Sequence, residues 1–290
     1  MHFIKGLAAK LRRITVTSTI AFVAVTSGAA MANTQVTGYM QAVAEASYKQ
    51  DGIAAFYREN GYQPIWTGDT ETHRLRRAAL MDALRSAHVH GLPRGRYDAQ
   101  ALMRQMANAR TTRDFGLVEV ALSKAFLDYA HDVQSGMLTP SSIDPGIVRE
   151  VPRRDDATLL SGLMSGDPRA FLNALPPTNA EYRALMKERF RLERVISDGS
   201  WGASVPECKL EPGDTGNAVI ALRNRLIAMG YLAPNASASY DRALEAAVRD
   251  FQQAHGLETD GVAGPGTIEE INVSPINRLR SVLVAMERER

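Results

Sequence analysis

The sequence predicts an all-α protein, and three observations support this fold class. Through residues 37–197, apolar side chains recur every three or four positions, which is the periodicity of an amphipathic helix. No run in the same stretch alternates between apolar and polar residues as a half-buried strand does. Glycine and proline separate the periodic segments and mark turns between successive helices.

The first predicted helix covers residues 37–60 and has Gly52 as a candidate kink. Pro64 then breaks the helix, because it lacks a backbone donor and forces Gln63 into an extended conformation. Trp66 follows this turn. Because its ring is large and apolar, we expect Trp66 to be buried and to pin the turn to the next helix.

The next helix is predicted over 71–88. An apolar stripe is expected to face the core, and the solvated side is formed by Arg74, Arg76, Arg77 and Arg85. Two further helices are predicted at 98–108 and 112–134, and a proline-rich loop follows at 137–156. Asp155 and Asp156 open a short helix, and a second short helix starts at Gly166. The last helix of this part is predicted over 178–197, with Thr178 as its cap and an apolar face formed by Tyr182, Leu185, Met186, Phe190 and Val195. Together they predict one helical domain over 33–198.

The N-terminus has the three parts of a secretory signal peptide. A cationic head precedes an apolar run at 14–25, and Ala30-Met31-Ala32 supplies a small-x-small cleavage site. An uncleaved membrane anchor is the alternative, but the run is shorter than the ~18 residues of a spanning helix. We therefore expect residues 1–32 to be removed and the protein to be periplasmic or secreted, with membrane contact only through this segment.

Composition limits the possible functions. Cleavage removes four of the 34 lysines and arginines and none of the 32 acidic residues, so the mature chain has a net charge of −2. The basic balance therefore comes from the targeting segment and does not indicate a nucleic-acid partner. Cys208 is the single cysteine, so these residues form no intrachain disulfide. Because no histidine is near it in sequence, we expect a linker thiol rather than a nucleophile.

The last quarter of the chain contains three predicted helices over 209–274. Its landmarks, in order, are Asp214, Gly216, Tyr231, Asp241, Phe251, Gln252, Asp260, Gly261 and Gly264. The two aspartates Asp214 and Asp241 are expected to cap helices, and the glycines are expected at turns that need positive φ or close backbone approach. This pattern resembles the peptidoglycan-binding domain 1 family, a three-helix module of bacterial cell-wall proteins. The resemblance implies that the landmarks hold the fold and that exposed polar positions beside the third helix contact peptidoglycan.

A second set of motifs lies on both sides of this module. It consists of Asn60-Gly61-Tyr62-Gln63-Pro64-Ile65-Trp66, His90-Gly91-Leu92-Pro93, Leu122-Ser123-Lys124-Ala125-Phe126-Leu127 and Val273-Ser274-Pro275. Their order, with the module inserted before the last motif, resembles the large periplasmic L,D-transpeptidases. The resemblance implies a helical scaffold domain at 33–198, a linker at 199–208, the module at 209–274 and a returning scaffold helix at 275–290.

The sequence departs from that family in its chemistry. The family has a catalytic domain after the returning helix, with a Ser/Thr-His-Gly-Cys nucleophile motif, and these 290 residues contain no Ser-His-Gly-Cys. Cys208 lies elsewhere and has no evident base or oxyanion donor around it in sequence. We therefore expect no catalytic residue on this chain. The alternative is a truncated or split L,D-transpeptidase whose crosslinking domain is missing.

Two histidine motifs are weak candidates for other chemistry. His88 and His90 are two residues apart, so their rings diverge on a helix, and no third metal ligand is nearby in sequence. His131 and Asp132 are expected to be a pair on a helix surface, without a serine or cysteine motif attached. Neither motif predicts a metal or a cofactor.

A helical wall hydrolase is the second alternative, and it would need paired carboxylates. The candidate pairs are Glu45 with Asp51 and Asp155 with Asp156. Acidic residues are expected at helix starts and on exposed faces in any case. The sequence therefore favours a secreted peptidoglycan-binding protein whose helical scaffold docks a separate catalytic or envelope protein.

Overall fold

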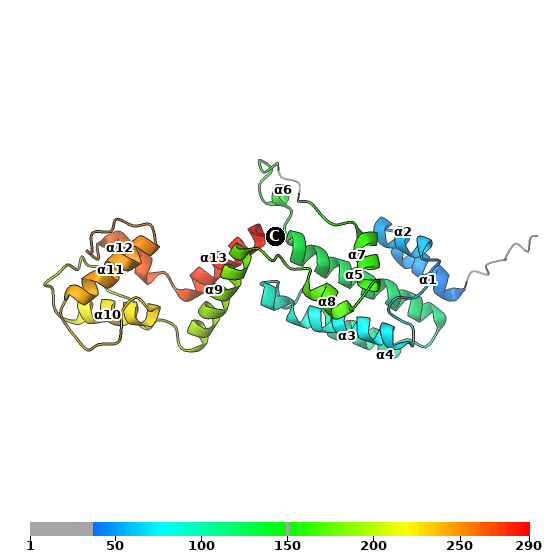
Figure 1. Cartoon of the computed structure of the whole chain (residues 1–290), viewed down its shortest axis with the longest axis horizontal. Helices are drawn as coiled ribbons and strands as arrows, with labels where there is room; N and C mark the ends of the chain where they lie inside the picture. Colours follow the sequence, from blue (N-terminus) through cyan, green and yellow to red (C-terminus); the bar gives the residue numbers. More distant parts are fainter. Residues whose placement is uncertain (1–36, 149–150) are drawn as a thin grey trace, which may run out of the picture. The chain divides into compact units, whose positions relative to one another are not determined.

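A computed structural model describes residues 37–148 and 151–290 of the chain (Figure 1). The predicted all-α class is confirmed: within those residues there are thirteen α-helices, one 3-10 helix and two isolated β-bridges. The elements are α1 (Gly38–Ser47), α2 (Asp51–Glu59), α3 (Glu71–Ser86), η1 (Ala87–His90), α4 (Ala99–Asn108), α5 (Thr112–Ser135), α6 (Pro140–Ile143), α7 (Asp156–Met164), α8 (Pro168–Asn173), α9 (Ala180–Ser197), α10 (Asn217–Met229), α11 (Arg242–Ala254), α12 (Pro265–Asn272) and α13 (Pro275–Arg288).

The predicted signal peptide, residues 1–32, lies outside the described residues. Over 37–148 and 151–290, no helix has both the length and the apolar character needed to cross a membrane.

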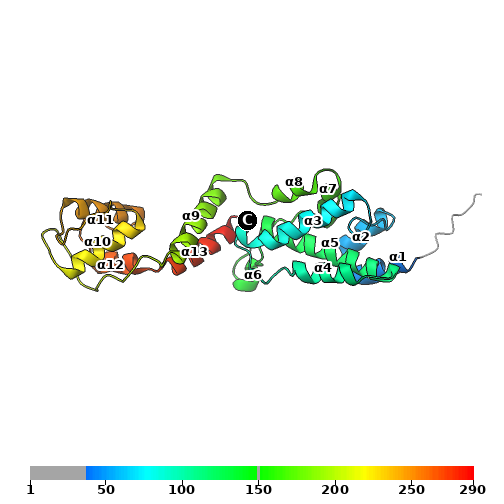
Figure 2. The same cartoon turned by 90° about the horizontal axis from the view of Figure 1, so that it is seen from below.

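Helix α5 is the centre of the first group of helices. Thr111 and Asp114 form a capping box at its start, because each side chain accepts a hydrogen bond from the backbone of the other. Helices α1, α2, α4 and α7 pack directly against α5, and Figures 1 and 2 show them around it. Because α5 is covered on several sides, even its polar residues Glu119, Ser123 and Asp132 are buried.

Glu119 is a fully buried carboxylate that holds the turn between α2 and α3. Its Oε1 accepts hydrogen bonds from Ile65 N at 2.6 Å, Trp66 N at 3.1 Å and the Tyr57 hydroxyl at 2.8 Å. Its Oε2 accepts from Thr67 N at 2.9 Å and Thr67 Oγ1 at 2.7 Å. A carboxylate is tolerated inside the protein only with such donors, so the turn and α5 depend on each other.

Trp66 is buried, as predicted, and its indole packs against α5, while its backbone carbonyl is bound by α3, the next helix. Its Nε1 donates to Ser123 Oγ at 2.8 Å, and its ring centroid lies 5.9 Å from that of Phe126. The indole therefore packs against the same face of α5 that carries the Glu119 carboxylate.

Two arginines of α3 hold the other side of this turn. Arg77 donates to the Trp66 carbonyl, and Arg76 donates to the Ile65 carbonyl at 3.2 Å. The expectation that the arginines of α3 lie on a solvated side is therefore wrong for Arg76, which is buried. Burial lowers the pKa of Arg76, and the nearby Glu119 carboxylate opposes that shift.

The predicted helix 37–60 is two helices, and the break lies before Gly52. Ser47, the last residue of α1, donates its hydroxyl to a carbonyl one turn earlier at 2.7 Å, which competes with continuation of the helix. Gly52 instead allows close packing, because a Cβ there would lie 2.3 Å from Asp156 Oδ2 of α7. The predicted loop 137–156 also contains the one-turn helix α6.

Helix α13 packs along α9, which is the partner that its apolar face requires (Figures 1 and 2). Asn179, rather than Thr178, caps α9, because its Oδ1 accepts from Tyr182 N at 2.7 Å. The predicted apolar face of α9 is wrong in part: Phe190 is 41% exposed, whereas Arg189 is buried. Arg189 points inward because its Nη1 donates to a carbonyl of η1 at 2.5 Å.

Helices α10, α11 and α12 enclose a second hydrophobic core, separate from the one around α5. An antiparallel bridge between Leu210 and Ala263 joins the segment before α10 to the segment before α12. The buried apolar side chains of the first core come from residues 43–175 and those of the second from 205–271. The domain boundaries placed at 198, 208 and 274 stay predictions.

Replacing Glu119 with glutamine should destabilise the protein by about 3 kcal/mol. Glutamine keeps the shape, but its amide nitrogen would face N–H donors that now bind the carboxylate. We expect a lower urea midpoint for Glu119→Gln than for the wild type. Glu59→Gln, at an exposed position of α2, is the control and should unfold like the wild type. Equal midpoints for the two variants would contradict the role given to Glu119.

Candidate functional site

The histidine motifs do not form a metal site. In the part of the chain that the structure describes, no group of three or more potential ligands converges. His88 Nδ1 contacts the Arg85 carbonyl at 2.9 Å, while the His90 ring stacks on Tyr182. Burial, with Arg290 and Arg189 nearby, lowers the pKa of His90 to about 4. His90 is therefore a neutral packing residue at physiological pH.

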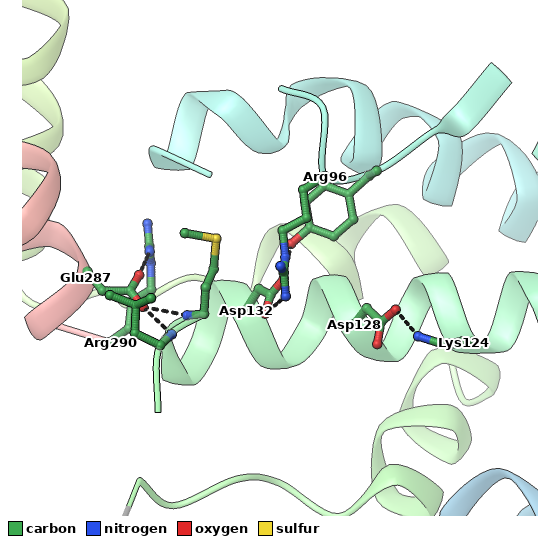
Figure 3. Close-up of polar contacts among 9 residues, drawn as sticks. Arg96, Lys124, Asp128, Asp132, Glu287 and Arg290 are labelled. Carbon is green, nitrogen blue, oxygen red and sulfur yellow. Dashed lines mark hydrogen bonds and ion pairs between the residues drawn. The ribbon is translucent and has the colours of Figure 1, made fainter. Parts of the chain in front are cut away.

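His131 and Asp132 turn to different partners, and the expectation of a surface pair is wrong. His131 Nε2 lies 2.7 Å from Asp156 of α7. Asp132 is buried and binds Arg96 and Tyr97, which precede α4 (Figure 3). Both side chains therefore tie α5 to its neighbours, because each is used in a contact between elements.

Three of the four carboxylates considered for hydrolysis are used in structural contacts. Glu45 pairs with Arg113 at 2.7 Å, and Asp155 caps α7 through Thr158 N at 2.9 Å. Asp156 binds His131, as described above. Asp51, the fourth, is exposed in the first turn of α2, where an acidic residue is expected in any case.

The end of α13 contacts the segment that follows α5. Glu287 Oε1 accepts from Met137 N at 2.5 Å and from Leu138 N at 2.8 Å (Figure 3). Arg290 binds Glu287 at 2.5 Å and donates to the His90 carbonyl. Beside these contacts is a largely apolar cavity of about 680 Å³, the α6–α13 cavity, lined by residues that include Leu138, Pro140, Ile143, Leu283 and Val284.

Gln252 is the centre of a polar network inside the predicted peptidoglycan-binding module. Its amide nitrogen donates to Asp260 Oδ1 at 2.9 Å, to the Val262 carbonyl at 3.0 Å and to Thr267 Oγ1 at 3.1 Å. Its Oε1 accepts from Gly261 N at 2.9 Å. Gln252 is 1% exposed, so this network holds the turn between α11 and α12 and is not available to a ligand.

Asp241 caps α11 as predicted, accepting from Leu244 N at 2.9 Å, and it also binds Arg223 at 2.8 Å. Asp214 does not cap a helix: its side chain accepts from Glu211 N at 2.8 Å within the turn before α10. The helix cap position there belongs to Gly216, whose φ is 110°. These contacts place the side chains of Asp214 and Asp241 in turns and caps.

The other landmarks have simple positions. Gly261 has φ 78°, as expected at a turn. Gly264, the residue before α12, has φ −76°, and a Cβ there would meet no atom within 4 Å, so the structure shows neither positive φ nor close approach at Gly264. Phe251 is fully buried, and Tyr231 packs edge-on against it with centroids 5.3 Å apart. Of the nine landmarks, Tyr231 alone lines a pocket described below.

An open groove of about 600 Å³ runs beside α12, where the contact surface was predicted. We call it the α12 groove, and it is lined by Glu207, Cys208, Lys209, Pro265, Ile268, Glu269, Asn272 and Val273. Lys209 Nζ pairs with Glu211 at 2.5 Å and is 60% exposed. This hydrogen bond raises the pKa of Lys209, so its ammonium is charged at the rim. Cys208 is a free, exposed thiol in the same groove.

Asn272 shapes the floor of the α12 groove. Its Nδ2 donates to the Val205 carbonyl at 2.8 Å, and its Oδ1 accepts from Val205 N at 2.9 Å. Val205 is buried, so this part of the predicted linker is fixed to the module. The groove is therefore formed by the linker on one side and α12 on the other.

A second pocket, of about 340 Å³, lies at the start of the linker. We call it the Trp201 pocket, and it is lined by Trp201, Tyr231, His255 and Arg278, with Glu188, Arg191, Met229 and Gly230. Glu270 binds Arg278 at 2.9 Å and His255 at 3.0 Å. Burial, and then the charge of Arg278, lowers the pKa of His255. Polar and aromatic side chains thus meet in a small concave site.

Sequence reasoning missed three residues that hold the elements described above together: Glu119, Trp201 and Glu287. Glu119 was not singled out because one acidic residue in an amphipathic helix does not reveal that its helix is buried on all sides. Trp201 was assigned to a linker, although a tryptophan in a glycine-rich stretch is a signal of burial. Glu287 had no signal, because its partners Met137 and Leu138 offer only backbone groups.

Comparison with protein families identifies two domains. Residues 51–188 match the family model of the scaffold domain, and residues 215–271 match that of a peptidoglycan-binding domain. A search of curated proteins gave no match. The chain therefore contains a scaffold domain and a peptidoglycan-binding domain, as predicted, and neither is a catalytic domain. The second domain associates the protein with the cell wall, while the L,D-transpeptidase parent stays a prediction.

Gln252→Leu should loosen the module, because the buried Gly261 N–H would lose its acceptor and the buried Thr267 hydroxyl would lose the donor that Gln252 supplies. Each such loss costs about 1–3 kcal/mol. We expect amide hydrogen exchange in α10–α12 to become at least about tenfold faster. Gln253→Leu is the matched control, since Gln253 is the adjacent glutamine and is exposed. If Gln252→Leu exchanged as slowly as the control, the structural role of this landmark would be excluded.

Proposed function

We propose that this protein binds peptidoglycan through the α12 groove and is a non-catalytic, wall-associated protein of the periplasm or cell exterior. The observation that carries the proposal is the match of residues 215–271 to a peptidoglycan-binding domain. The groove is a suitable contact surface because it is open, and its charged side chains are at the surface rather than used in the core.

The groove combines both charges with an apolar floor. Lys209 offers an ammonium group, Glu207 and Glu269 offer carboxylates, and Ile268 lies beneath them. The peptide stems of peptidoglycan carry carboxylates, an amino group and methyl side chains. A groove with this composition can pair with each of them, and hydrogen bonds to charged groups give such contacts specificity.

A second proposed function concerns the helical scaffold. The α6–α13 cavity is apolar, and Leu138, Ile143 and Val284 beside it are 49%, 61% and 54% exposed. Contiguous exposed apolar surface of this kind is typical of protein interaction sites. The order of motifs that resembles L,D-transpeptidases makes a catalytic domain of that type, on a separate protein, the proposed occupant.

Lys209→Glu should weaken co-sedimentation of residues 33–290 with purified sacculi about tenfold, or about 1.4 kcal/mol. Lys124→Glu is the matched control, because Lys124 is 52% exposed and pairs with Asp128 at 2.5 Å on α5 (Figure 3). Lys209 is likewise an exposed lysine that pairs with a carboxylate, that of Glu211. Failure of the wild type to sediment above a scrambled-sequence control would refute peptidoglycan binding. Equal losses in both variants would refute the groove.

A photo-crosslinking amino acid at Ile143 tests the scaffold proposal in growing cells. We expect a crosslink to an L,D-transpeptidase catalytic domain, identified by mass spectrometry. The control position is Ile220 on α10, which is 37% exposed and outside the α6–α13 cavity. Crosslinks that are absent at Ile143, or that are the same at both positions, would contradict docking at this cavity.

A further inference from the structure

Trp201 lies in the predicted linker, yet it is only 4% exposed. The guanidinium of Arg225 lies 5.8 Å from its ring centroid, and that of Arg278 lies 5.7 Å from it. Cation–π contacts of this kind hold the indole and the two guanidinium groups in one cluster. A linker that only joined two domains would not need a tryptophan held by two cations.

The cluster has an excess of positive charge. Arg225 is 4% exposed, and the hydrogen bonds of its guanidinium go to backbone carbonyls, Ile271 O and Gly202 O at 3.1 Å each. Arg278 has one carboxylate partner, Glu270, at 2.9 Å. Glu270 also binds His255 at 3.0 Å, and among the ion pairs of the described residues none involves Arg225, so its charge has no carboxylate partner there.

The Trp201 pocket also has a buried hydrogen-bond donor that lacks an acceptor. Trp201 Nε1 is buried and has no hydrogen-bond partner among the described residues. Arg191 at the rim binds Glu188 of the same lining at 2.7 Å, Arg278 lies inside, and Tyr231 adds a hydroxyl. A buried donor without an acceptor is unfavourable, so the site is suited to a ligand that brings acceptor oxygens and negative charge.

We propose that the Trp201 pocket is a second ligand site, which binds a carboxylate of a peptidoglycan peptide stem. This inference rests on the proposed peptidoglycan binding and adds to the α12 groove a subsite of defined chemistry. A planar carboxylate fits the fork of an arginine such as Arg278, and the apolar part of one stem residue fits against Met229. The volume of about 340 Å³ suits one stem residue better than a disaccharide.

Intrinsic fluorescence of the full chain reports on this site. Trp66 and Trp201 are the two tryptophans, and Trp66 is fully buried in the other core, so a ligand-dependent change in emission comes from Trp201. The probes are a soluble disaccharide tetrapeptide with free carboxylates and the same muropeptide with methyl-esterified carboxylates. We expect saturable change with the free acid and at least about tenfold weaker binding of the ester, because the ester lacks the charge.

Three variants locate the binding. Arg191→Gln, at the exposed rim, should weaken binding of the free acid at least threefold, and Arg278→Gln should weaken it more. Arg280→Gln is the control, since Arg280 is exposed on the same helix and bonds only Asn277. Circular dichroism and urea unfolding identify any variant that has lost its fold. If Arg278→Gln has lost its fold, Arg191→Gln still tests the site.

The outcomes separate this inference from the proposed function. If the wild type sediments with sacculi but the free acid and the ester bind equally, or Arg191→Gln and Arg278→Gln bind like Arg280→Gln, the carboxylate site is refuted and the α12 groove stands. If sedimentation fails while the free acid still binds selectively at Trp201, the wall-binding proposal is refuted and the carboxylate site stands. No emission change with either probe also refutes the site.

Discussion

An ionised carboxylate loses its hydration when a helix buries it, and Glu119 recovers that loss from donors that all belong to the turn before α3 and to Tyr57 of α2. This requirement acts in both directions. The turn can place three successive N–H groups on one side chain only when α5 runs behind it, and α5 can bury a glutamate only when the turn is formed. The hydrogen bond from Trp66 to Ser123 adds a second contact between the same two segments.

Buried arginines have a corresponding role at other junctions. Arg189 joins α9 to η1, Arg290 joins the end of α13 to η1 and to Glu287, and Arg225 joins α10 to the linker. Each donates to at least one backbone carbonyl, so each holds a neighbouring segment through its main chain rather than through a side chain. A guanidinium suits this task because its five donors lie in one plane and reach several carbonyls at once.

In the matched peptidoglycan-binding domain, the residues that hold the turns differ from those that line the proposed ligand sites. Gln252, Asp260 and Gly261 are used in the turn between α11 and α12. The α12 groove and the Trp201 pocket are instead lined by residues of the predicted linker, of α9 and of the start of α13, together with the module. The segments that enter and leave the module therefore contribute to its proposed ligand sites.

The sequence alone determined the fold class, most helix positions and the two matched domains, because helical periodicity, caps and turn residues are local properties. It identified Asp241 as a cap and Trp66 as buried for the same reason. Tertiary structure decided which polar residues are inside. Glu119 and Arg76 look like solvated residues in sequence, and Trp201 looks like part of a linker. Their burial depends on segments more than ten residues away in the chain, whose approach no local pattern contains.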